Sequence, residues 1–114
     1  MLSASNHPPY ILPDDIPFKP KSRDIKQQMV EYADWALGHF VSQAQKPDWF
    51  ANTLFVFVAD HGYAKPSSLY QMPLSYHHTP MFLYYPTEIA PQRDSSLALQ
   101  IDLTPTILSM LFSD

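Results

Sequence analysis

The residues best suited to chemistry stand together as Asp60-His61-Gly62, directly after an apolar run. A carboxylate oxygen beside an imidazole nitrogen suits a divalent metal ion such as Mn²⁺, Zn²⁺ or Mg²⁺. Glycine leaves the backbone free to turn, so both neighbouring side chains could converge on one ion although strand residues normally alternate. The competing interpretation is a strand-ending turn, in which Asp60 caps backbone amides and His61 is an ordinary surface residue.

The segment that must position this pair is the apolar run itself. Residues 53–59 are apolar or β-branched without alternation, which is typical of a strand buried on both faces of a parallel sheet. We therefore expect 53–59 to be a central strand. Asp60 and His61 would then lie at its carboxyl end, where ligands bind in open α/β sheets.

The remaining elements surround this strand in the sequence. Repeated prolines predict an extended, ordered arm over residues 1–20. A helical apolar stripe predicts a helix over 22–45 with Ser22 as its N-cap, and a second apolar segment predicts a strand over 80–85. A hydroxyl or carboxylate before a proline predicts a last helix over 104–112. Strands that alternate with helices indicate the α/β class.

Composition excludes several kinds of protein. The 114 residues fit one small domain, and the absence of cysteine rules out thiolate chemistry and disulfides. The formal net charge of -4, with seven scattered lysines and arginines, argues against nucleic acid as a partner. No apolar run approaches the roughly 20 residues of a membrane span, and no signal peptide is recognisable, so we expect these residues to be soluble.

Four segments carry a family resemblance: residues 6–10, 32–37, 49–62 and 100–108. In this order and spacing they resemble the C-terminal half of lipoteichoic-acid-synthase-like phosphoglycerol transferases and sulfatases, which belong to the alkaline phosphatase superfamily. The resemblance spans nearly the whole chain. It implies that residues 1–114 are the C-terminal portion of a sulfatase-type catalytic domain, part of an alkaline-phosphatase-like sheet flanked by helices.

The resemblance also implies roles for individual residues. Asp60 and His61 match the family's paired ligands of a divalent metal ion, which could be Mn, Zn or Mg. His7 matches a histidine that contacts the phosphate or sulfate oxygens of the substrate, although a lone histidine in a proline-rich arm is more often solvated. His78, preceded by His77, falls near where some branches of the superfamily place another metal or anion ligand, and this correspondence is weaker.

No residue of this chain matches the family's nucleophile, a threonine or a formylglycine. We therefore expect a fragment that is inactive alone, from a parent enzyme acting on phosphate or sulfate esters of a lipid headgroup or glycan. The resemblance implies that the parent is membrane-anchored, with an extracytoplasmic catalytic domain. The sequence leaves phosphoglycerol transfer, phosphoethanolamine transfer and sulfate ester hydrolysis open.

Two other interpretations stay open from the residues alone. The chain could be a self-contained, non-enzymatic oligomeric module whose Asp60-His61 pair is structural. It could also be a small metallohydrolase that uses water, although two ligands are fewer than the usual three. Because an apolar strand needs neighbours on both faces, we expect the isolated chain to self-associate.

Overall fold

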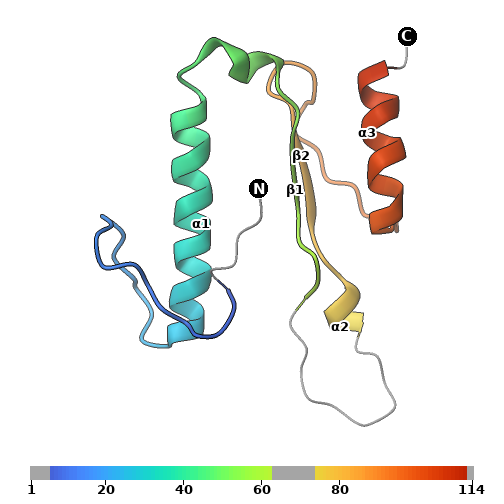
Figure 1. Cartoon of the computed structure of the whole chain (residues 1–114). Helices are drawn as coiled ribbons and strands as arrows, with labels where there is room; N and C mark the ends of the chain where they lie inside the picture. The colour runs from blue at the N-terminus through green and yellow to red at the C-terminus, as the bar shows by residue number, and fades with distance from the viewer. Residues whose placement is uncertain (1–5, 63–73, 113–114) are drawn as a thin grey trace.

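The computed structural model describes residues 6–62 and 74–112. Its elements are helix α1 (Ile25–Ala44), the 3₁₀ helix η1 (Asp48–Asn52), strand β1 (Phe55–Val58), helix α2 (Leu74–His77), strand β2 (Met81–Tyr84), the 3₁₀ helix η2 (Gln100–Asp102) and helix α3 (Leu103–Phe112). In Figure 1, α1 and α3 stand on opposite sides of the β1–β2 pair. This mixture of helices with a small sheet confirms the predicted α/β class.

Helix α1 begins at Ile25 with Asp24 as its N-cap, two residues after the predicted cap. The Asp24 carboxylate accepts a hydrogen bond of 3.0 Å from the Gln27 amide and so satisfies one of the free donors of the first turn. The Ser22 hydroxyl instead donates to the Glu31 carboxylate. The predicted cap at Ser22 was therefore wrong, because its hydroxyl is used across the first two turns. The helix ends at Ala44, ahead of Pro47.

Strands β1 and β2 form an antiparallel pair, with Phe55 opposite Tyr84 and Val58 opposite Met81. Among the residues described here β2 is the one partner of β1, so the expected central strand of a parallel sheet is not found there. A continuous apolar run indicates that side chains tend to be buried, but it encodes neither the direction nor the number of partner strands. Phe55 is buried in this arrangement, whereas Val58 is 43% exposed.

The small core joins the end of α1 to the sheet. Ala44, Phe50 and Phe55 are buried together, and the Phe50 and Phe55 rings lie 5.2 Å apart. The turn of η1 places Phe50 there, and it is closed by Thr53, whose hydroxyl donates to the Trp49 carbonyl. This packing fixes the start of β1, and through it the position of the strand's carboxyl end.

The arm preceding α1 packs on the helix without forming a helix or strand over residues 6–20. Phe18 contacts Tyr32 and Trp35 of α1, with ring centroids 5.7 Å apart in both cases.

At the other end of the chain, the Asp102 carboxylate accepts a hydrogen bond from the Leu99 amide, which stabilises η2 ahead of α3. The last helix thus begins one residue before the predicted range of 104–112.

Candidate functional site

Asp60 and His61 follow β1 after Ala59, and their side chains lie close to each other. The His61 Nε2 atom is 3.7 Å from Asp60 Oδ2, and the His61 amide donates to Asp60 Oδ1 at 2.9 Å. Both side chains are accessible, with 54% of His61 and 75% of Asp60 exposed. The second carboxylate oxygen and one ring nitrogen are therefore available together to a ligand in solvent.

The orientation of the His61 ring is fixed by the residues around it. Its Nδ1 atom lies 2.9 Å from the Gly62 carbonyl oxygen. A carbonyl oxygen only accepts, so this contact requires the proton on Nδ1 and leaves the lone pair of the neutral ring on Nε2. The Tyr76 ring stacks on His61 with centroids 4.8 Å apart. The nitrogen that faces Asp60 is thus the one that can bind a cation.

A residue from the far end of the chain holds the backbone of this site. Gln100 Nε2 donates to the carbonyl oxygens of Ala59 and Asp60, at 2.8 and 2.9 Å. The two protons of one amide group satisfy two consecutive carbonyls at the end of β1. Gln100 therefore links η2 to the strand terminus that carries the pair.

His7 is exposed on the arm, and its Nδ1 atom lies 2.7 Å from the Pro8 carbonyl oxygen. No hydrogen bond or ion pair of the described residues joins His7 to Asp60 or His61, so their shared site stays a prediction.

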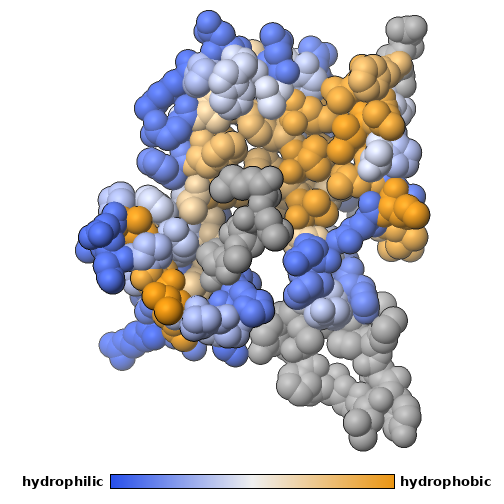
Figure 2. All heavy atoms as spheres, in the orientation of Figure 1, coloured by the Kyte–Doolittle hydropathy of each residue, from blue (hydrophilic) through white to orange (hydrophobic). Residues whose placement is uncertain are grey.

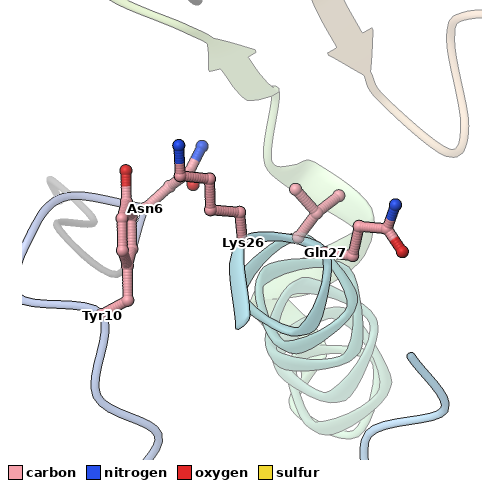
Figure 3. Close-up of a pocket in the computed structure, with 5 residues that line it drawn as sticks. Asn6, Tyr10, Lys26 and Gln27 are labelled. Atoms are coloured by element: carbon pink, nitrogen blue, oxygen red, sulfur yellow. The ribbon is translucent and has the colours of Figure 1, made fainter. Parts of the chain in front are cut away.

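A shallow pocket of about 290 Å³ lies between the arm and the first turns of α1. Asn6 and Tyr10 line it from the arm, and Lys26, Gln27 and Val30 line it from the helix. Figure 3 shows the polar ends of Asn6 and Tyr10 directed to the same side as the Lys26 side chain. The pocket is a surface depression between two segments, separate in the sequence from the Asp60-His61 pair.

His77 and His78 lie at the end of α2. The His77 and Tyr76 rings are perpendicular with centroids 5.2 Å apart, and His78 is exposed immediately after the helix. Within residues 6–62 and 74–112, no hydrogen bond or ion pair connects His78 with the Asp60-His61 pair. Its role as a further ligand stays a prediction.

The comparison with known families bears on this geometry. The sulfatase family model matches residues 1–112 of the chain. The chain belongs to the sulfatase family. This confirms the predicted membership of the sulfatase and alkaline phosphatase superfamily, while the narrower likeness to lipoteichoic acid synthases stays a prediction. No solved structure matches this sulfatase-family chain significantly.

The donor atoms of this sulfatase-family chain fit a divalent ion as two of its ligands. Nitrogen and oxygen ligands lie about 2.0–2.2 Å from such an ion, which places two of them about 3.4 Å apart in a tetrahedral site. The observed 3.7 Å between Nε2 and Oδ2 needs only a small side-chain adjustment. The described part of the chain contains no cluster of three potential ligands. The spacing of the pair is therefore compatible with two ligands of one ion, and the metal site itself stays a prediction.

Two residues of the site were missed by sequence reasoning. Tyr76 stands in a polar segment, and Gln100 stands 40 residues beyond Asp60. Neither has a local sequence signal, although Gln100 falls within a segment that carries the family resemblance. In the described ranges of this sulfatase-family chain, no helix is long and apolar enough to cross a membrane.

Proposed function

We propose that Asp60 and His61 supply two ligands of a divalent metal ion, Mn²⁺, Zn²⁺ or Mg²⁺, in an enzyme that acts on phosphate or sulfate esters. The observation that carries this proposal is the pairing of His61 Nε2 with Asp60 Oδ2 at 3.7 Å, both exposed, at the end of β1. Membership of the sulfatase family supports it. The reaction is sulfate ester hydrolysis, or transfer of phosphoglycerol or phosphoethanolamine.

Each side chain has a defined task in this proposal. When bound, the ion would stabilise negative charge on the attacking oxygen and on the oxygens of the ester. Asp60 uses Oδ1 to accept from the His61 amide and keeps Oδ2 for the ion. His61 uses Nδ1 on Gly62 and keeps Nε2. His7 binds oxygens of the ester group if the arm carries it to the same site.

The resemblance extends this proposal to the whole enzyme. We propose a membrane-anchored parent with an extracytoplasmic catalytic domain that acts on lipid headgroup or glycan esters. The nucleophile would come from residues other than those of this chain, because none of them matches it. The chain alone should then bind metal weakly and lack turnover.

Metal binding tests the pair directly. Mn²⁺ added to the ¹⁵N-labelled chain should broaden the amide resonances of residues 60–62 first, because paramagnetic broadening is strongest next to the ion. Asp60→Asn and His61→Ala should each abolish this selective broadening. Asp34→Asn, an exposed carboxylate on α1, is the matched control and should leave it unchanged. Equal broadening in Asp60→Asn would refute the assignment of the ligands.

Activity tests the absent nucleophile. The purified chain should show no turnover of chromogenic phosphodiesters or sulfate esters, with or without added Mn²⁺ or Zn²⁺. The control is Asp60→Ala. If the chain shows metal-stimulated turnover that disappears in this variant, the nucleophile lies within these 114 residues and our proposal is wrong on that point.

A further inference from the structure

Tyr76 lies against the candidate ligand His61 and contacts it in two ways. The two rings stack with centroids 4.8 Å apart and an interplanar angle of 27°. The Gly62 amide donates to the Tyr76 carbonyl oxygen at 2.7 Å. Tyr76 therefore contacts the segment 60–62 through both its backbone and its side chain. It does so from α2, which is separate from that segment in the sequence.

The stacked ring limits how His61 can move. An exposed histidine next to a glycine would ordinarily sample several side-chain rotamers, because the short polar segment offers little packing. The tyrosine face blocks one side of the imidazole, and the Nδ1 contact with Gly62 holds its edge. A half turn of the ring would place a carbon atom where Nε2 now faces Asp60, and it would break the Gly62 contact.

The Tyr76 ring is itself held in place. It is half-buried, and the His77 ring lies perpendicular to it with centroids 5.2 Å apart. The Tyr76 carbonyl oxygen also accepts a hydrogen bond from the Gly62 amide. The ring that stacks on His61 is therefore an ordered side chain on α2.

We propose that Tyr76 is a positioning residue, which holds the His61 imidazole so that Nε2 is presented to the metal ion. This inference rests on the proposed function of His61 as a ligand. Groups that orient a ligating histidine are as much a part of a metal site as the ligands, and their loss typically weakens metal binding 10–100-fold. The stacked face is the feature that matters, so phenylalanine should replace tyrosine and leucine should not.

The test compares Tyr76→Phe with Tyr76→Leu in the full 114-residue chain. In the metal-free chain, ring ¹⁵N shifts of His61 report which nitrogen carries the proton. Mn²⁺ titration, followed by broadening at residues 60–62, reports affinity. Hydrogen exchange of the Gly62 amide shows whether its bond to the Tyr76 carbonyl survives, which separates loss of the ring from unfolding.

Three results are informative. We expect wild type and Tyr76→Phe to hold the proton on Nδ1 and to bind Mn²⁺ alike. In Tyr76→Leu the tautomer should become mixed and the affinity should fall about 10-fold while Gly62 stays protected. An unchanged tautomer and affinity in Tyr76→Leu would overturn the role of Tyr76. If His61→Ala binds Mn²⁺ as wild type does, the proposed function fails instead, and the metal-free tautomer still decides whether Tyr76 orients the ring.

Discussion

Glu31 is the side chain that ties the end of the arm to α1. Its carboxylate accepts from the Lys21 amide at 2.7 Å, from the Ser22 amide at 3.1 Å and from the Ser22 hydroxyl. The hydrogen bond from the Ser22 side chain, followed by that from the Lys21 backbone, holds the pKa of Glu31 below its ordinary value. The charged form is therefore the one that docks the arm, which carries His7 at its other end.

The pH dependence of this attachment follows from the lowered pKa of Glu31. A carboxylate with a folded-state pKa below its unfolded value stabilises the fold above the unfolded pKa, and this contribution is lost as pH falls through the folded pKa. We expect the protection of the Lys21 and Ser22 amides against hydrogen exchange to fall in acid. Glu31→Gln should lower the same protection already at neutral pH. Asp34→Asn, an exposed carboxylate on the same helix, is the control. Unchanged protection in Glu31→Gln would contradict the role of its charge.

At the scale of elements, Gln100 joins the end of β1 to η2 and α3. Its amide reaches two carbonyls that lie 41 and 40 positions earlier in the sequence, while α3 itself has no buried residue. The attachment of η2 and α3 to the end of β1 therefore depends on few contacts. The backbone of the Asp60-His61 pair and the last helix should respond together when this link is removed.

The variant Gln100→Leu tests this link. It removes both donors while keeping a similar side-chain volume, so the free energy of unfolding should fall by about 0.5–1.5 kcal/mol. The amide resonances of Asp60 and His61 should shift, because their carbonyl neighbours lose a partner. Gln92→Leu is the control, because it changes an exposed glutamine in the segment between β2 and η2. It should neither lower the free energy of unfolding nor shift the amide resonances of Asp60 and His61. Shifts confined to residues around position 100 would show that the link does not support the site.

The elements differ in how far the sequence could specify them. The range of α1 was predictable because its apolar residues follow a helical period, yet Asp24 and Ser22 are both good caps and only the partner of Ser22 decides between them. The Asp60-His61 pair was predictable because adjacency in sequence is adjacency in space. The antiparallel pairing of β1, and the approach of Gln100, depend on contacts that no local pattern encodes.

The whole molecule is more open than a compact domain of its length. Its accessible surface is 10037 Å², against about 6,400 Å² for a compact monomer of 13.1 kDa. Its radius of gyration is 17.0 Å, against about 13 Å for 114 residues. Figure 2 shows apolar atoms gathered over the sheet and α3. Phe82 of β2, Ile101 of η2 and Phe112 of α3 are among the exposed apolar residues. These apolar side chains remain accessible in the single chain.

We predict that a second copy covers this apolar face when the chain is alone. Association would remove the exposed apolar side chains of this face from water, which is favourable. Light scattering coupled to size exclusion should therefore show dimers or larger species at tens of micromolar. Phe82→Lys should shift the distribution toward monomer, because a charge in the apolar face would be desolvated on association. Ile11→Lys, at a position on the arm that is 73% exposed against 62% for Phe82, should leave the distribution unchanged. A clean monomer with cooperative unfolding would show that the exposed face needs no cover.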